Sequence, residues 1–239
     1  MLEERFSRDY DVTYFGYSAD GHFDRLNISS SWYYAYGEQE STRLRSEDEK
    51  VRAWFTATEM SWDIDWFRPR LSFLYASGDD DPFDQRAEGF DAIFENPQFA
   101  WADTSFWIRQ NVPLIGGGGV VLSGRNGILP SLRASKEQGQ SNFINPGIML
   151  IGLGADADLL PQLRLSFNIN HLRFDTTEVL ERLRQQAPID KALGEDISMS
   201  LIWRPFMTQN AVFRFSMAGL NPGKGFEDLF GDEARTPYS

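Results

Sequence analysis

Cysteine is absent from this 239-residue chain, and histidine occurs only twice. Without cysteine the chain can form no disulfide framework, no thiolate metal site and no thiol nucleophile, and its redox compartment stays undecided. Long apolar runs are also absent, since no segment approaches the ~18 residues of a transmembrane helix. These absences exclude the disulfide-rich, thiol-dependent and helical membrane classes of protein.

The charge balance of the chain is acidic. Its 23 basic and 35 acidic residues leave a formal net charge of −12, which argues against nucleic-acid binding because that needs a basic face. The length suits one domain with a sizeable core or one closed barrel. The average composition is that of a water-soluble protein, yet transmembrane β-barrels have similar averages because their strands alternate apolar and polar residues.

Eight segments alternate apolar and polar residues with a period of two, which predicts β-strands. They cover residues 9–19, 25–37, 51–64, 70–77, 145–158, 162–174, 195–204 and 211–219. At 8 to 14 residues they are longer than ordinary strands of about 5 to 6 residues, and they suit tilted membrane strands. The sequence therefore predicts an all-β protein.

The connections between these segments alternate between short and long. The short ones are residues 20–23, 65–68, 159–161 and 205–209, and the long ones are 38–50, 78–144, 175–194 and 220 onward. Outer-membrane barrels alternate periplasmic turns with longer extracellular loops in this way, and they carry aromatic girdles at the membrane interfaces. Aromatic residues also gather near the predicted strand ends: Trp62, Trp66, Phe67, Trp203 and Phe206.

We therefore expect an antiparallel up-and-down transmembrane β-barrel in a bacterial outer membrane. A soluble sandwich or lipocalin-like barrel is the alternative, since its strands also alternate. If the short turns are periplasmic, both ends of the chain lie outside the cell, whereas barrels of this class keep their termini in the periplasm. Residues 1–239 are thus expected to form a single β-barrel domain, incomplete at both ends, with about eight strands.

The segment 78–144 is too long for a simple connection. It combines an acidic tip with aromatic and glycine-rich stretches, a mixture too aromatic for a disordered linker. We expect a long extracellular loop or a loop inserted into the lumen, where it would form a constriction or plug. The acidic residues Asp79, Asp80 and Asp81 are weak calcium candidates because hard cations prefer carboxylate oxygens, but a solvated acidic tip is the favoured interpretation.

A helix signal follows the sixth predicted strand. Asp175 and Glu178 match the N-cap and N3 positions of a capping box before VLERLRQQ. We expect a short structural helix on an extracellular loop, with Leu180 and Leu183 packed against the rim.

The sequence shows no recognisable set of catalytic residues. The sequence contains neither a G-x-S-x-G elbow nor an H-E-x-x-H zinc motif. His22 is expected in a short turn and His171 near the opposite end of the barrel, so they would not share a site. We expect no enzyme activity and no cofactor; a rim hydrolase using His171 with Ser166 or Asn170 is an alternative.

The polar sides of the strands are expected to line the lumen. This orientation points Arg70, Arg164, Arg204 and Arg214 inward, where a basic band would attract anions. The alternative is that Asp63, Asp156 and Asp158 lie at the same depth and neutralise the band. Neutral hydrogen-bonding groups suited to water and sugars would complete the lining: Asn27, Ser29, Ser31, Ser166, Asn168, Asn170, Ser198 and Ser200.

Residues 73–91 (FLYASGDDDPFDQRAEGFD) resemble the alginate-export family of outer-membrane porins, in which a strand ending in an Ala-Ser-Gly-Asp-like sequence opens into a long acidic loop. The strand pairs LLPQLRLSFNINHLRF and LIWRPFMTQNAVFRFSMAGL are compatible with the C-terminal half of that family. The resemblance implies a single-chain barrel whose positively lined pore passes an anionic polysaccharide. Under this resemblance, the four arginines named above are candidates for the positive lining. The aspartates expected in the lumen are a departure from the family, whose pore is positively lined.

We accordingly expect a porin-like channel for polar solutes, including anionic ones or polysaccharide. Its partners would be the outer-membrane bilayer, its solutes and a periplasmic export protein, without nucleic acid. A structural barrel that sheaths a partner protein is the alternative from another class.

Overall fold

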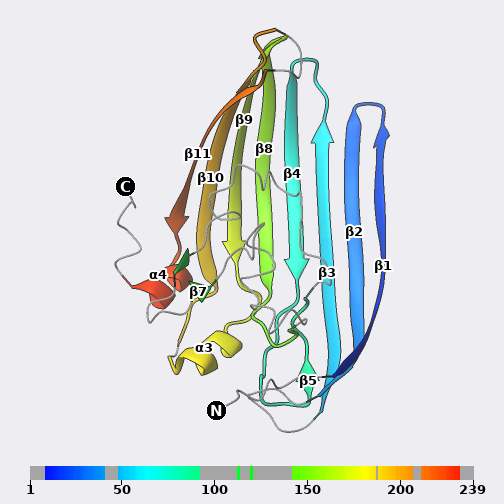
Figure 1. The fold of residues 1–239 in the computed structure, drawn as a ribbon, viewed down its shortest axis with the longest axis vertical. Helices are drawn as coiled ribbons and strands as arrows, with labels where there is room; N and C mark the ends of the chain where they lie inside the picture. Colours follow the sequence, from blue (N-terminus) through cyan, green and yellow to red (C-terminus); the bar gives the residue numbers. More distant parts are fainter. Residues whose placement is uncertain are drawn as a thin grey trace.

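The computed structural model describes residues 9–40, 48–91, 112–113, 119–120, 142–186, 188–206 and 211–231. Over these residues the protein is an all-β structure built on one open, mostly antiparallel sheet (Figure 1). Most of the predicted loop 78–144 lies outside the described residues, as do residues 207–209 of the predicted 205–209 turn. None of the described helices is long and apolar enough to cross a membrane.

Eight long strands form the sheet, in the order β1-β2-β3-β4-β8-β9-β10-β11. Their bounds are β1 Tyr10–Phe23, β2 Leu26–Gln39, β3 Glu49–Trp62, β4 Phe67–Ala76, β8 Ile148–Leu160, β9 Leu163–Arg173, β10 Ala192–Trp203 and β11 Phe213–Pro222. Each overlaps one of the eight predicted segments, and each pairs antiparallel with its neighbours. The prediction of an all-β antiparallel structure is therefore confirmed.

Three short strands accompany the long ones. β5 Arg86–Ala87 pairs in parallel with the start of β3, and β6 Val112–Pro113 pairs with β7 Gly119–Val120 in a separate two-stranded sheet. β5 lies within the long connection and pairs with a part of β3 that β4 does not reach, so this part of the connection is tied to the main sheet beyond the end of β4.

The strand ends that the four short connections join lie at one end of the sheet, here called the turn end, and the opposite strand ends lie at what is here called the loop end (Figure 1). One predicted turn is wrong: residues 20–23 belong to β1, where Asp20 pairs with Ser29. The hairpin needs only residues 24 and 25, because Asp24 adopts a left-handed φ of 53° that closes a two-residue turn.

Two short helices lie at the loop end. α3 Glu178–Arg184 confirms the predicted helix, but its N-cap is Thr177 and not Asp175, and Thr177 makes no side-chain capping hydrogen bond. The Asp175 carboxylate instead accepts hydrogen bonds from the Gly78 amide at 2.8 Å and the Tyr75 hydroxyl at 3.0 Å. These hydrogen bonds join residues that are 97 and 100 positions apart and hold the end of β4. Because the Asp175 carboxylate is engaged in them, it does not cap α3.

The second helix, α4 Lys224–Phe230, lies in the predicted connection after residue 220 and was not expected from the sequence. Phe226, Leu229 and Phe230 are buried there. This helix extends the core at the loop end.

Period-2 geometry gives the sheet two faces of different character. The inner face carries Arg70 and Leu74 of β4, and the outer face carries Leu71 and Phe73. In the half nearer the loop end, the inner face is a hydrophobic core, with paired neighbours Leu74, Leu150 and Leu172 at most 1% exposed.

The two described ends of the long connection also pack on this core. Phe90 stacks on Phe55 of β3 with ring centroids 5.1 Å apart, and Phe143 is fully buried. The Tyr14 hydroxyl donates a hydrogen bond to the Asp91 carbonyl at 2.8 Å. Both described ends of the long connection therefore lie over the inner face of the sheet.

Candidate functional site

The outer face of the sheet carries large apolar side chains that are exposed. Leu153 at the middle of β8 is 58% exposed, and Met217 on β11 is 66% exposed. Other large apolar side chains exposed on this face include Phe15, Tyr17, Met60, Leu71, Phe73, Ile151, Phe167, Ile197, Met199 and Phe215. A contiguous exposed apolar surface of this kind marks a membrane or protein contact.

Charged residues on the outer face of the eight strands are confined to the loop end. They are Asp11, Glu38, Lys50, Arg52, Arg173 and Glu195. Near the turn end, this face instead carries aromatic side chains such as Trp62, Trp203 and Phe213. The apolar belt is therefore bounded by charged residues on one side and by aromatic residues on the other.

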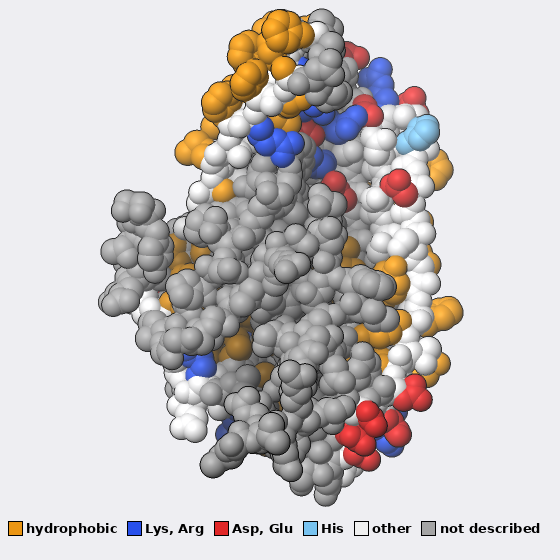
Figure 2. Space-filling view, viewed as in Figure 1, with side chains coloured by type: hydrophobic (Ala, Val, Ile, Leu, Met, Phe, Trp, Pro, Cys, Tyr) orange, Lys and Arg blue, Asp and Glu red, His pale blue; other side chains and the backbone are white. Residues whose placement is uncertain are grey.

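The inner face is polar in its turn-end half. We define the inner-face polar cluster as Glu59, Ser61, Asp63, Arg68, Arg70, Asp156, Asp158, Arg164 and Asn168, which come from β3, β4, β8, β9 and the β3–β4 turn. Figure 2 shows basic and acidic side chains gathered together near the turn end of the molecule. The strand register brings these residues together, because Ser61, Arg70, Gly154 and Asn168 are successive partners across the sheet.

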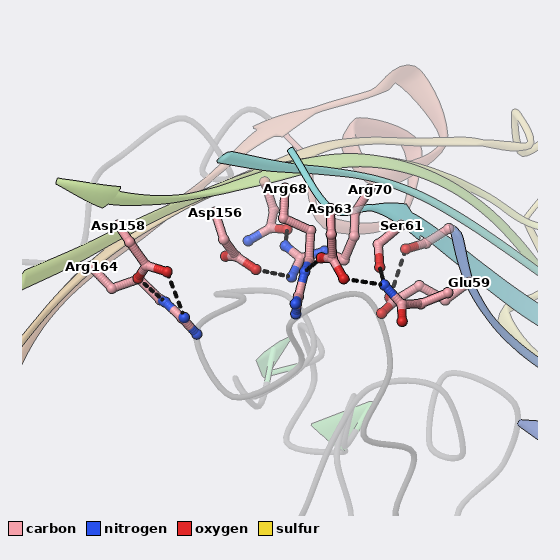
Figure 3. Close-up of polar contacts among 11 residues, drawn as sticks. Glu59, Ser61, Asp63, Arg68, Arg70, Asp156, Asp158 and Arg164 are labelled. Atoms are coloured by element: carbon pink, nitrogen blue, oxygen red, sulfur yellow. Dashed lines mark hydrogen bonds and ion pairs between the residues drawn. The ribbon is translucent and has the colours of Figure 1, made fainter. Parts of the chain in front are cut away.

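Arg70 is the central residue of this cluster and is only 8% exposed. Its Nη1 donates a hydrogen bond to Asp156 Oδ2 at 2.9 Å, and its Nη2 donates one to Asn168 Oδ1 at 2.7 Å (Figure 3). A buried guanidinium requires such partners because leaving water costs several kcal/mol unless the charge is paired. Asp156 is therefore the counter-ion that permits Arg70 to lie inside.

Two further ion pairs lie nearer the turns (Figure 3). Arg164 holds Asp158 through two parallel hydrogen bonds of 2.7 and 2.9 Å, and both side chains are partly exposed. Arg68 pairs with Asp63, which also accepts a hydrogen bond of 2.9 Å from the Asn27 amide. The Asn27 hydrogen bond and the Arg68 guanidinium hold the pKa of Asp63 below its usual range.

These pairs decide between two interpretations of the predicted arginine band. Asp63, Asp156 and Asp158 each lie against an arginine, so the charge-pairing alternative is confirmed for these three aspartates. Arg70 and Arg164 consequently do not form an uncompensated basic lining.

The other predicted lining residues also lie at the turn-end half or next to it. Arg204 follows β10, and Arg214 on β11 is the partner of Ile202. Asn168 accepts from Arg70, as described, and the Asn170 amide lies 3.4 Å from Asp196 Oδ2 on β10. The six candidates thus lie on β4, β9 and β11 or directly after β10.

Sequence reasoning missed Arg68 and Glu59 as members of the cluster. Arg68 lies two residues before Arg70 and therefore faces the same side of β4. Glu59 accepts a hydrogen bond of 2.8 Å from the Ser72 hydroxyl. The same period-2 count that selected Arg70 would have found both residues.

Glycines on β8 leave room for the long polar side chains of the cluster. A Cβ added to Gly154 would clash with Asn168 Oδ1 and would lie 2.7 Å from Arg70 Nη2. A Cβ at Gly152 would likewise clash with Asn170 Oδ1. The two positions are therefore part of the site because they let neighbouring side chains lie flat across β8.

The residues named for the alternative of a rim hydrolase do not lie together. His171 lies on the outer face, where its Nδ1 is 3.2 Å from Glu195 Oε1, whereas Ser166 and Asn170 are buried on the inner face. Alternation along β9 separates these side chains to opposite sides of the sheet. The proposed pairing of His171 with Ser166 or Asn170 is therefore wrong.

The acidic tip does not converge on one point. Asp79 is buried, and its Oδ1 accepts a hydrogen bond of 3.1 Å from the Asp81 amide, whereas Asp80 and Asp81 are exposed. Burial raises the pKa of Asp79 to about 8. Within the described ranges, no group of three or more His, Cys, Asp or Glu residues could hold a metal ion.

Comparison with known proteins adds no assignment. The sequence matches no protein-family model. A search of curated proteins likewise found no significant match. The function has to be inferred from the two faces of the sheet.

Proposed function

We propose that this sheet forms part of the wall of a transmembrane β-barrel in a bacterial outer membrane, and that the barrel is a porin-like channel for polar solutes. The observation that carries the proposal is the reversed polarity of the faces: Leu153 and Met217 are exposed, while Arg70 and Asp156 are buried on the opposite side. In water this arrangement would expose the apolar side of the sheet to solvent and sequester its charges. In a bilayer both faces would be favourably placed.

Strand length supports a membrane-spanning role. The eight long strands contain 10 to 14 residues, and a tilted strand needs about 9 to 11 to cross a bilayer. Aromatic side chains border the apolar belt, as they do at membrane interfaces. Trp62 and Trp203 occupy this position at the turn end, and Tyr36 and Trp54 at the loop end.

The inner-face polar cluster supports passage of polar solutes. Because its arginines lie against aspartates, its net charge is small and we expect weak discrimination between anions and cations. This differs from the strongly basic pore that an anionic polysaccharide would favour. We therefore propose neutral and weakly charged solutes, with anionic polysaccharide as a less favoured cargo.

The apolar core at the loop end favours a second candidate, a barrel whose interior is filled. Phe90 and Phe143 pack on the inner face where an open porin would hold water. Such packing suits a constriction formed by the 78–144 loop, or a structural barrel that supports a partner protein. The two candidates differ in whether ions pass.

Conductance in a planar lipid bilayer tests the channel proposal. We expect the detergent-purified product of the complete reading frame to insert and to give steady openings, with a reversal potential near zero in a potassium chloride gradient after correction for ion mobility. Strong anion selectivity would contradict the charge-pairing argument. A chain that inserts but remains silent would favour the filled barrel, and a chain that stays monomeric in water without detergent would overturn both.

A further inference from the structure

The neutral polar residues in the turn-end half of the inner face differ in their access to solvent. Five of the eight that the sequence predicts as a lining are buried on β9 and β10: Ser166, Asn168, Asn170, Ser198 and Ser200. The other three, on β2, are exposed or partly exposed: Asn27, Ser29 and Ser31. The predicted lining therefore divides into a covered part and an accessible part.

This contrast does not come from the open edges of the sheet. β2 has a neighbour on each side, β1 and β3, just as β9 and β10 each lie between two strands. Asn27 and Ser198 also lie in one row of successive partners across the sheet. The inner face is therefore accessible over β2 and inaccessible over β9 and β10 for a reason other than position in the sheet.

We define the polar strip as Ser18, Asp20, Asn27, Ser29 and Ser31, which lie on the inner face of β1 and β2. Ser18 Oγ lies 2.9 Å from Ser31 Oγ, and the Ser29 hydroxyl donates a hydrogen bond of 2.7 Å to Asp20 Oδ1. Ser18 and Asp20 are exposed. In Figure 2 this part of β1 and β2 lies open at the right of the view. The strip is therefore a continuous polar surface with access to solvent.

The two ends of the polar strip have different surroundings. Tyr14 lies four residues before Ser18 on the same face of β1 and packs edge-on against Phe90, with ring centroids 6.2 Å apart. At the other end, the Asn27 amide donates its hydrogen bond of 2.9 Å to Asp63 of the inner-face polar cluster. The strip is therefore bounded by the apolar core toward the loop end and continues into charged residues toward the turn end.

Asp20 gives the polar strip its charge. Within the described ranges it accepts the Ser29 hydrogen bond and has no ion-pair partner, whereas Asp63, Asp156 and Asp158 each lie against an arginine. A carboxylate on a membrane-spanning strand is costly unless it is paired or faces water. Asp20 therefore requires water over the strip, which the paired aspartates do not.

We propose that the polar strip lines the water-filled part of the barrel interior, and that Asp20 is the residue through which this wall acts on charged solutes. The proposal rests on the proposed channel function and specifies where its solutes pass. Serine hydroxyls offer donors and acceptors to a hydrated solute, and the Asp20 carboxylate attracts cations and repels anions. Because a single exposed carboxylate is screened by water and salt, its effect is weak. The strip therefore admits neutral polar solutes and small hydrated cations.

Thiol labelling tests where the water lies. Residues 1–239 contain no cysteine, so Ser29→Cys, Ser30→Cys and Ser198→Cys each add one thiol to the product of the complete reading frame in vesicles. Ser30 follows Ser29 and faces the outer side, and Ser198 is buried on the inner side. A water-soluble anionic methanethiosulfonate, present on both sides of the membrane, should label position 29 at least about tenfold faster than positions 30 and 198, because thiolates form poorly in apolar surroundings. The unsubstituted protein gives the background.

Reversal potentials test the role of Asp20. In a potassium chloride gradient, Asp20→Asn should shift the reversal potential toward chloride selectivity, and Asp20→Arg should shift it further because the charge is then reversed. Glu38→Arg is the matched control, since Glu38 is an exposed acid of β2 on the outer face, and it should leave the potential unchanged. Equal shifts in Asp20→Arg and Glu38→Arg, or no shift in either, would overturn the role of Asp20.

The outcomes separate this inference from the proposed function. A protein that conducts, but is labelled no faster at position 29 than at position 198, refutes the strip and keeps the channel. A protein that inserts without conducting refutes the channel and the action of Asp20 on passing ions, and labelling then decides whether the strip holds water. Fast labelling at position 29 alone supports a water-filled strip, and slow labelling there overturns it.

Discussion

The buried ion pair between Arg70 and Asp156 offers a quantitative test of the inner face. Both side chains are below 10% exposed, at 7% and 9%, and their nearest atoms are 2.9 Å apart. Arg70→Met keeps most of the side-chain length and removes the positive charge, which leaves Asp156 buried without its cation. Breaking a buried pair in this way costs about 3–5 kcal/mol.

The pair between Arg164 and Asp158 provides a matched comparison on the same face. Its geometry is at least as good, with two hydrogen bonds of 2.7 and 2.9 Å. Its side chains, however, are 35% and 46% exposed. Since exposed ion pairs contribute only about 0–1 kcal/mol, Arg164→Met should be nearly neutral.

Reversible urea unfolding of the chain from lipid vesicles measures both effects. We expect the free energy of unfolding to fall by about 3–5 kcal/mol in Arg70→Met and by at most about 1 kcal/mol in Arg164→Met. The double variant Arg70→Met, Asp156→Leu should recover much of the loss, because no unpaired charge remains. Equal losses in the two single variants would show that burial does not determine the strength of these pairs.

Three further substitutions probe other parts of the account. Gly154→Ala should lower the free energy of unfolding by about 1 kcal/mol, measured in urea, because its Cβ would displace Asn168 Oδ1 from the Arg70 guanidinium that donates a hydrogen bond to it. Leu153→Arg should make folding into lipid vesicles less favourable by about 2–4 kcal/mol. The folded chain retains a proton on Asp79, whose pKa burial raises to about 8, whereas the unfolded chain loses it above about pH 4. The free energy of unfolding should therefore decline between these pH values, and Asp79→Asn should flatten the decline.

Each of these substitutions has a control. Gly219→Ala adds a Cβ that meets nothing within 4 Å, so it should not be destabilising through a clash. Asp80→Asn changes the exposed neighbour of Asp79 and should leave the pH profile as it is. A soluble sheet would tolerate arginine at Leu153, which is 58% exposed, so a negligible effect in vesicles would argue against lipid contact.

Much of the fold could be predicted because alternation is a local property. The period of two located all eight long strands and placed Leu71 and Arg70 on opposite faces of β4. The sequence alone does not show that the inner face is apolar in its loop-end half and polar in its turn-end half. Leu74, Leu150 and Leu172 share a face with polar residues nearer the turns, and only the register brings the three leucines together as a core.

Long-range contacts explain the failures. Asp175 has the local pattern of an N-cap, but it binds the Gly78 amide and the Tyr75 hydroxyl, which are distant in the sequence. The pairing of arginines with aspartates was foreseen as an alternative, yet the choice depended on register between β4, β8 and β9. Ser166, Ser198 and Ser200 could be placed on the inner face from sequence, but their complete burial is visible only in the structure.

Spin-label accessibility tests the central claim that the outer face contacts lipid. Because the chain has no cysteine, single substitutions Leu153→Cys, Ser216→Cys and Met217→Cys each accept one nitroxide label in a chain reconstituted into vesicles. Ser216 and Met217 are adjacent on β11 and face opposite sides. Labels at positions 153 and 217 should be relaxed by oxygen, which dissolves in lipid, and the label at 216 by a water-soluble nickel chelate. If the chelate reaches all three labels equally, the outer face lies in water and the membrane account is wrong.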